Sequence, residues 1–240
     1  MAKAFSIPFV AFFGRNYEEY LAMFSLDESS LRGRSILDCP SGPDSFVAEG
    51  FKHGLNVIGC DPMYAMSLEQ LCKSGKEHID ECFLQLQQTP GNFDIRDIDK
   101  FRKDKYDALE SFATDYLSGK ETRYIDASIP NLPFADRSFD LVLSSHFLFC
   151  YSAVKDGGML QSDMFDLDFH LKGITELARV TRSELRMTPT HSMQAPPRRH
   201  PYLDASVKHL ESLGFKVTIE PSDYDDGFAP FVEILVGRSS

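Results

Sequence analysis

Two carboxylates near the start of the chain each end a short apolar run. Asp38 ends the run Ser35-Ile-Leu-Asp38, and Asp61 ends the run Asn56-Val-Ile-Gly-Cys-Asp61. The runs predict two strands with a loop and a helix between them. In an open α/β sheet the ligand crevice lies outside the carboxyl ends of the strands, so Asp61 is well placed to receive the hydroxyl pair of a ribose.

The loop after Asp38 narrows the kind of nucleotide that fits. Gly42 has no Cβ and lets a ligand approach the main chain closely. Dinucleotide sites carry G-x-G-x-x-G here and bind a pyrophosphate on the helix N-terminus, whereas this loop reads Cys39-Pro-Ser-Gly-Pro-Asp44. Asp44 would repel a phosphate. The loop favours a cationic, phosphate-free adenosine ligand and disfavours an NAD-dependent oxidoreductase, which remains an alternative.

Four segments, in order, make the chain similar to class I S-adenosylmethionine-dependent methyltransferases. They are residues 36–42, 57–62, 124–146 and 176–180, within a stretch of roughly residues 34 to 182. The resemblance implies an α/β, Rossmann-like methyltransferase fold: a seven-stranded, mostly parallel sheet with an antiparallel last strand and helices on both faces. The chain departs from the family at Pro40, where glycine is usual, and at Thr181-Arg-Ser-Glu184, where a Pro-Gly-Gly turn is usual.

The same resemblance implies S-adenosyl-L-methionine as cofactor and S-adenosyl-L-homocysteine as product. A carboxylate at the position of Asp126 accepts a hydrogen bond from the adenine amino group, while the main-chain amide of Ala127 donates to the ring; a turn aspartate is the alternative. Arg15 or Tyr20 could contact the cofactor carboxylate, or Tyr20 could pack on the sheet. The residues expected to bind the cofactor are Tyr20, Asp38, Pro40, Gly42, Asp61, Pro62, Met63, Asp126, Ala127 and Ser145.

Methyl transfer is an in-line displacement, so the protein must align nucleophile and methyl and, if needed, take a proton. His146 follows the apolar run Asp140–Ser145 and is the best-placed general base, because its ordinary pKa lies near neutral pH. Tyr151 could orient the acceptor, and His170 could face it from the following helix. Each of these side chains could instead be a packed one, and a thiolate or amine acceptor could react without a base.

Metal, nucleic acid and membrane are not expected as partners. The acidic residues before His170 suit the first turn of a helix better than a metal site. A net charge of −11 argues against a nonspecific nucleic-acid surface. The segment Phe5–Phe13 is too short for a membrane span. Five cysteines without a C-x-x-C pair suit a reducing compartment, with the cytoplasm as default.

We therefore expect a small-molecule acceptor that is methylated on oxygen, nitrogen or sulfur. Nucleic-acid amino methyltransferases carry an Asn-Pro-Pro-Tyr-like run where this chain has Ser144-Ser-His-Phe147. The acceptor would lie between the end of the Asp140–Ser145 strand, inserted helices and the loop His191–His200. A noncatalytic cofactor-binding or partner-binding module on the same fold is the alternative, because the usual glycines are missing. The sequence fixes neither the acceptor nor the oligomeric state.

The 240 residues suit a single domain, 1–240, with a helical cover over residues 1–30. About sixty residues separate Asp61 from the next strand, at Arg123–Asp126, more than one crossover needs. Residues 74–120 are therefore expected to be a helical insertion or lid. The expected helices are Asn16–Phe24, Met66–Lys73, Ile79–Gln87, Lys100–Leu117 and Tyr202–Leu213, with a break at Thr89-Pro-Gly-Asn92; the expected last strands are Leu185–Thr188, Phe215–Glu220 and Phe231–Gly237.

Overall fold

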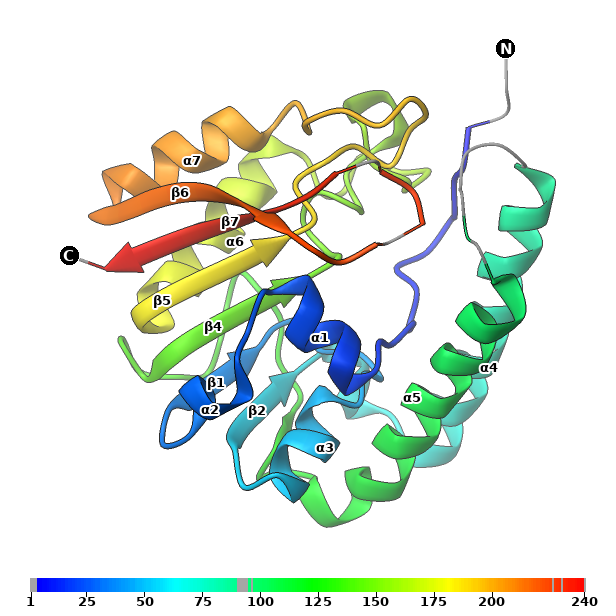
Figure 1. Cartoon of the computed structure of the whole chain (residues 1–240), viewed down its shortest axis with the longest axis horizontal. Helices are drawn as coiled ribbons and strands as arrows, with labels where there is room; N and C mark the ends of the chain where they lie inside the picture. Colours follow the sequence, from blue (N-terminus) through cyan, green and yellow to red (C-terminus); the bar gives the residue numbers. More distant parts are fainter. Residues whose placement is uncertain (1–3, 90–94, 96, 226, 230, 240) are drawn as a thin grey trace.

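A computed structural model describes residues 4–89, 95, 97–225, 227–229 and 231–239. In these residues seven strands form one sheet of order β3-β2-β1-β4-β5-β7-β6 (Figure 1). The strands are β1 (Ser35–Asp38), β2 (Asn56–Cys60), β3 (Tyr124–Ile125), β4 (Phe139–Ser145), β5 (Thr181–Thr188), β6 (Phe215–Ser222) and β7 (Val232–Ser239).

The first five strands run parallel, and β7 runs antiparallel to both β5 and β6. This is the predicted methyltransferase fold, including its antiparallel last strand. β5 starts at Thr181, four residues before the expected Leu185. The polar first residues of β5 belong to the strand because neighbouring strands pair with them on both sides. Glu184 lies opposite Leu141 of β4 and opposite Arg238 of β7.

Helices cover both faces of the sheet. On one face lie α1 (Tyr17–Met23), α3 (Phe46–Lys52) and the long pair α4 (Leu68–Gln88) and α5 (Ile98–Gly119). On the other lie α6 (Leu167–Val180) and α7 (Leu203–Ser212). Alternate strand residues enter the two cores: Ile36 packs with the first group and Leu37 with the second, as the two-residue period of a strand requires.

The inserted helices differ from the prediction. Met66–Lys73 and Ile79–Gln87 are not separate helices, since α4 runs unbroken from its N-cap Ser67 to Gln88. Gly75 does not break it: an added Cβ there would come within 2.8 Å of Leu109 Cδ1, so the glycine permits close packing of α4 on α5. The predicted Lys100–Leu117 helix is present as α5. Residues 90–92 of the expected break lie outside the described residues.

The N-terminal part includes the expected helix. α1 begins after Asn16, whose side chain accepts from Glu19 N while the Glu19 carboxylate accepts from Asn16 N, a capping box. A short helix, α2 (Glu28–Leu31), follows that the sequence analysis did not anticipate. Before α1, the extended segment up to Gly14 passes between the carboxyl ends of the strands and the α4–α5 pair (Figure 1), and Ile7 bridges to Leu160.

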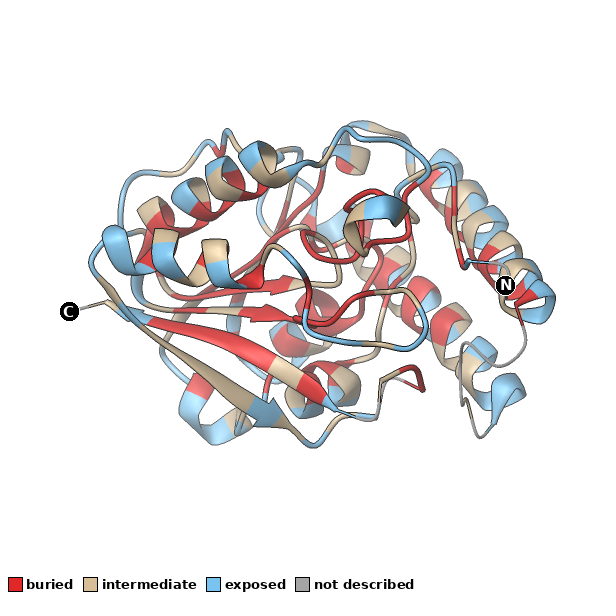
Figure 2. Ribbon diagram, turned by 90° about the horizontal axis from the view of Figure 1, so that it is seen from above, coloured by how far each residue is buried: buried red, intermediate tan, exposed pale blue. Residues whose placement is uncertain are grey.

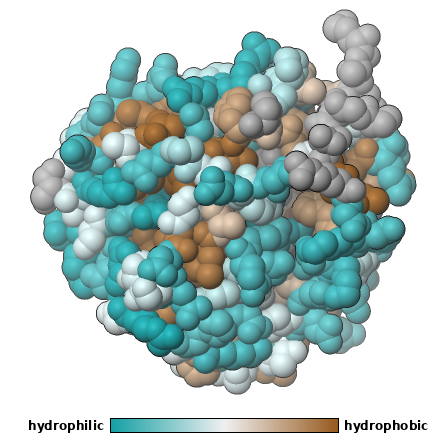
Figure 3. Space-filling view, viewed as in Figure 1, coloured by the Kyte–Doolittle hydropathy of each residue, from teal (hydrophilic) through white to brown (hydrophobic). Residues whose placement is uncertain are grey.

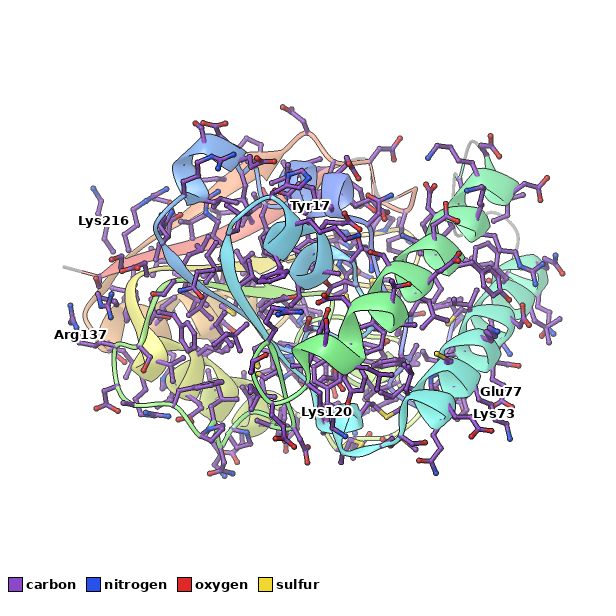
Figure 4. The ribbon with its side chains drawn as sticks, turned by 90° about the horizontal axis from the view of Figure 1, so that it is seen from below. Tyr17, Lys73, Glu77, Lys120, Arg137 and Lys216 are labelled. Atoms are coloured by element: carbon purple, nitrogen blue, oxygen red, sulfur yellow. The ribbon has the colours of Figure 1, made fainter. Side chains whose placement is uncertain are left out.

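The central strands are the most deeply buried elements, and the outer faces of the helices are exposed (Figure 2). On the face seen in Figure 3, hydrophilic residues predominate and hydrophobic residues gather in small patches. The helical pair carries surface charge: Lys73 and Glu77 of α4 point away from the body of the molecule, 3.9 Å apart (Figure 4). Among the described residues, no helix is long and apolar enough to cross a membrane.

Candidate functional site

A cavity of about 470 Å³ lies at the carboxyl ends of β1, β2 and β4. Its wall combines the loops after these strands with the N-terminal segment, the insertion and the segment after β4. The predicted site residues that line it are Tyr20, Pro40, Gly42, Asp61, Pro62, Met63, Ser145, His146 and Tyr151. Nine of the residues predicted to bind cofactor or acceptor thus line a single cavity.

The loop after β1 and the end of β2 are joined by hydrogen bonds. Gly42 adopts φ +58°, a conformation that favours glycine, and its N–H donates to Asp61 Oδ2 at 3.0 Å. Met63 N donates to Asp61 Oδ1 at 2.8 Å, and the Tyr64 hydroxyl donates to the Gly42 carbonyl at 2.6 Å. Burial raises the pKa of Asp61 to about 6. A carboxylate has about four acceptor positions, so Asp61 can still receive further donors.

Asp38 lies behind this loop and not on the cavity wall, so its direct contact with a cofactor stays a prediction. The Tyr20 hydroxyl lies 3.1 Å from Asp38 Oδ2 and 3.1 Å from Asp44 Oδ2, and Ser41 Oγ donates to Asp44 at 2.9 Å. Burial and the Asp44 charge raise the pKa of Asp38 well above its ordinary value. Asp44 itself borders the cavity, and its effect on a phosphate stays a prediction.

Asp126 and Ala127 follow β3 but do not line the cavity, although the next residue, Ser128, does. Asp126 is exposed. Its contact with an adenine ring therefore stays a prediction, as does the main-chain contact at Ala127.

His146 stands at the end of β4 with φ +46°, and its N–H donates to the Thr188 carbonyl at 2.7 Å. Its Nδ1 lies 2.8 Å from Ser145 Oγ, and that hydroxyl is 3.4 Å from Met23 Sδ. Burial, together with the nearby charges of Arg15, His191 and Lys105, holds the pKa of His146 well below its ordinary value. The imidazole is therefore neutral at physiological pH.

Of the other two predicted catalytic residues, only Tyr151 reaches the cavity. Its hydroxyl accepts a hydrogen bond of 3.0 Å from Ala11 N and thereby holds the N-terminal segment in place. His170 is fully buried on the far side of Phe149, between α6 and the ring of His200. Its Nδ1 donates to the Asp166 carbonyl at 2.8 Å. The expectation that His170 faces the acceptor is wrong, because the first turn of α6 points it into the core.

Most of the cavity wall is apolar, and the sequence analysis did not identify most of these apolar residues. Aromatic and sulfur-containing side chains come from four separate loops and from α4 to α6: Phe5, Phe12, Phe13, Cys82, Phe101, Phe147, Cys150, Met159, Phe165, Phe169, Met193 and Phe228. The spacing of Phe165 and Phe169 across the start of α6 is the one periodic signal among them. Met193 belongs to the loop that was expected to line the acceptor.

In the described part of the chain, no three His, Cys, Asp or Glu side chains converge in a way that could hold a metal ion. Cys39 and Cys60 are fully buried beside the strand ends, as expected of small apolar residues.

The chain is similar to several known proteins. The methyltransferase-domain family matches residues 103–184, from α5 to β5. An uncharacterized protein of Methanocaldococcus jannaschii, MJ0045, is 29% identical over 216 residues, covering 88% of this chain and 89% of that protein. Among solved structures, magnesium protoporphyrin IX methyltransferase of Synechocystis with bound SAM is 14% identical, with a TM-score of 0.47, covering 89% of this chain and 73% of that one. The 1,6-didemethyltoxoflavin-N1-methyltransferase of Burkholderia thailandensis is 11% identical, with a TM-score of 0.43 and coverage of 93% and 84%.

The sheet order gives the chain a Rossmann-like fold, with a cavity at the carboxyl ends of its strands. The match to the methyltransferase-domain family over residues 103–184 is the similarity expected of a class I S-adenosylmethionine-dependent methyltransferase.

Proposed function

We propose that the chain transfers the methyl group of S-adenosylmethionine to a small, largely hydrophobic acceptor. One cavity of about 470 Å³ carries this proposal. It joins the hydrogen-bonded pair of Gly42 and Asp61, here called the cradle, to a wall of phenylalanines. Cavities of roughly 300–1,000 Å³ are typical of small-molecule sites. A polynucleotide or protein acceptor would need an open surface instead.

The residues at the cradle suit the cofactor. Asp61 would receive the ribose hydroxyls, and the absence of a side chain at Gly42 would let the cofactor lie against the main chain. Asp44 disfavours phosphate but suits a cationic ligand. When bound, S-adenosylmethionine supplies an electrophilic methyl group on a sulfonium. Adenine recognition by Asp126 and Ala127 is retained as part of the proposal.

His146 is the proposed general base. In the tautomer that this role requires, the Ser145 hydroxyl donates to Met23 Sδ and its oxygen accepts from His146 Nδ1–H, which leaves the Nε2 lone pair available. Nε2 would take the proton that the acceptor atom loses as its bond to the methyl carbon forms. The low pKa of His146 keeps that lone pair unprotonated. Tyr151, on the same wall, would help orient the acceptor.

The insertion is part of this proposal. Cys82, Leu86 and Phe101 bring residues 74–120 to the cavity wall, as a lid over the acceptor would require. The N-terminal segment covers the same space and is fixed through Ala11 and Tyr151. Together these two segments would exclude water from the reacting groups.

Calorimetric titration with S-adenosylhomocysteine and, in parallel, with NADH tests the cofactor. We expect S-adenosylhomocysteine alone to bind, and Asp61→Ala to weaken it by about 1–3 kcal/mol, while Asp168→Ala on the surface of α6 leaves the affinity unchanged. Binding of NADH alone would favour an oxidoreductase. Labelled methyl transfer to a panel of apolar hydroxyl, amine and thiol compounds then tests catalysis, and cofactor binding without transfer would favour a noncatalytic module.

A further inference from the structure

The cavity wall contains a partly buried cation, Arg15. Arg15 lines the cavity, and its carbonyl accepts a hydrogen bond of 2.9 Å from Ser45 N, which fixes its main chain against the loop after β1. The guanidinium interacts with the Tyr224 hydroxyl, but its buried Nε has no hydrogen-bond partner among the described residues. Within the same residues no carboxylate comes within ion-pair distance of it.

Glu19, whose charge acts on Arg15, has no free acceptor position for its guanidinium. Its Oε1 accepts from Lys105 Nζ at 2.7 Å and from the Tyr224 hydroxyl at 2.8 Å. Its Oε2 accepts from Lys105 Nζ at 2.9 Å and from Asn16 N at 2.8 Å. These four contacts occupy the four acceptor positions of a carboxylate. The charge of Glu19 is thus committed to Lys105 and to the cap of α1.

Arg15 and Lys105 are the two cations of this cluster, and the Glu19 carboxylate, whose charge acts on both, forms its ion pair with Lys105. Lys105 is fully buried, with its Nζ 4.6 Å from the ring centre of Phe101 and 5.7 Å from that of Phe13. Both rings line the cavity. A guanidinium without a carboxylate at ion-pair distance, beside such an apolar space, is costly unless a ligand brings the opposite charge.

The side chains around Arg15 come from elements outside the cradle. Tyr224 lies in the loop between β6 and β7, Lys105 on α5, and Cys150 in the segment after β4. The charges of Arg15 and Lys105 both act on His146, which directly follows β4. The guanidinium thus lies near the proposed base and the apolar wall.

We propose that the acceptor is an apolar acid whose carboxylate pairs with Arg15 while its hydrocarbon part lies among the phenylalanines. The planar guanidinium presents its N–H donors in a geometry that matches a carboxylate. This inference rests on the proposed function, because it names the acceptor class of the same site. The carboxylate would serve as an anchor that fixes the acceptor in front of His146.

A matched pair of probes tests the charge. On protein saturated with S-adenosylhomocysteine, we expect 1-naphthoate to bind at least tenfold more tightly than 1-naphthamide, which has nearly the same shape without the charge. Arg15→Gln should remove this preference, and Arg15→Lys should keep part of it. Arg32→Gln, an exposed arginine beside α2, is the control and should keep all of it. Equal binding of the two probes to the wild-type protein would overturn the proposal without any variant.

The carboxylate of the cofactor itself is the competing occupant of Arg15. Titration with S-adenosylhomocysteine and with 5′-methylthioadenosine, which lacks the amino acid part, separates the two. We expect Arg15→Gln to change neither affinity by more than about twofold. A loss of tenfold or more for S-adenosylhomocysteine alone would assign Arg15 to the cofactor and overturn the proposal. If the wild-type protein bound no S-adenosylhomocysteine, the proposed function would fail, and the naphthoate and naphthamide titrations of the unliganded protein would still decide the Arg15 site.

Discussion

The main-chain N–H of Gly42 donates a hydrogen bond of 3.0 Å to Asp61 Oδ2, which ties the loop after β1 to the end of β2. The second oxygen of Asp61 accepts from Met63 N at 2.8 Å. Two motifs that lie nineteen residues apart in the chain thus form one rigid cradle. The carboxylate orients the loop, and in the proposed function its remaining acceptor positions would receive the ribose hydroxyls.

The pKa of Asp61 leads to a prediction about pH. Burial raises this pKa to about 6, so the folded protein holds a proton that the unfolded chain loses near pH 4. The stability from this group is therefore present below about pH 4 and lost as pH rises through 6. Ribose hydroxyls, in contrast, need the ionised form as acceptor. We expect the affinity for S-adenosylhomocysteine, measured by calorimetry, to fall as pH drops below about 6, approaching tenfold per pH unit.

Asp61→Asn is the control for this effect. The amide cannot titrate, so its S-adenosylhomocysteine affinity should be weaker at pH 8 and nearly flat between pH 8 and pH 5. A wild-type affinity that does not change across this range would remove Asp61 from the ribose site.

Gly42→Ala is expected to reduce both stability and cofactor affinity. At φ +58° an L-residue is strained by about 1–2 kcal/mol, and the methyl group would narrow the approach to the main chain. Gly33→Ala is a matched control, because Gly33 has φ +75° with open space around it and lies away from the cavity. Urea unfolding should report similar losses for both variants, while only Gly42→Ala weakens binding of S-adenosylhomocysteine. Equal binding by the two variants would contradict close contact of the ligand at Gly42.

Tyr20→Phe tests the buried carboxylate pair behind the cradle. The Tyr20 hydroxyl lies within hydrogen-bond distance of both Asp38 and Asp44, and the substitution removes it. We expect this loss to lower the free energy of unfolding by about 1–3 kcal/mol. Tyr17→Phe removes a comparable bond to the partly exposed Glu28 and should cost less, because water can replace it. Urea unfolding at pH 7 measures both. An equal or larger loss for Tyr17→Phe would show that the Tyr20 network contributes little.

The sequence predicted the parallel part of the fold because its strands are short apolar runs that end in recognisable polar residues. Asp38 and Asp61 marked the ends of β1 and β2 correctly, and Asp61 reaches the cavity as predicted. The helical boundaries within the insertion were harder to predict. Ser74 and Gly75 resemble a helix end, but packing against Leu109 of α5 overrides that local preference.

The sequence predicted only the part of the site that lies at strand ends. The residues proposed to bind the cofactor follow strand ends, where sequence order fixes their place in the fold. The proposed acceptor wall is built largely from loops, and nothing in the local pattern places Phe5, Met193 and Phe228 around one cavity. The direction of His170 likewise depends on the rotation of α6, since one face of that helix borders the cavity and another enters the core.

His146 and His170 provide the last prediction, because one lines the cavity and the other is buried beside it. His146→Asn keeps a residue that tolerates φ +46° but cannot take a proton, so turnover should fall by about 10²–10⁴-fold with little change in S-adenosylhomocysteine affinity. His170→Asn loses the contacts with Phe149 and His200 and should lower the free energy of unfolding by about 1–3 kcal/mol, while turnover at low temperature is retained. Labelled methyl transfer and urea unfolding on both variants separate the two roles. Full turnover by His146→Asn would leave His146 as part of the cavity wall, with an acceptor that reacts without a base.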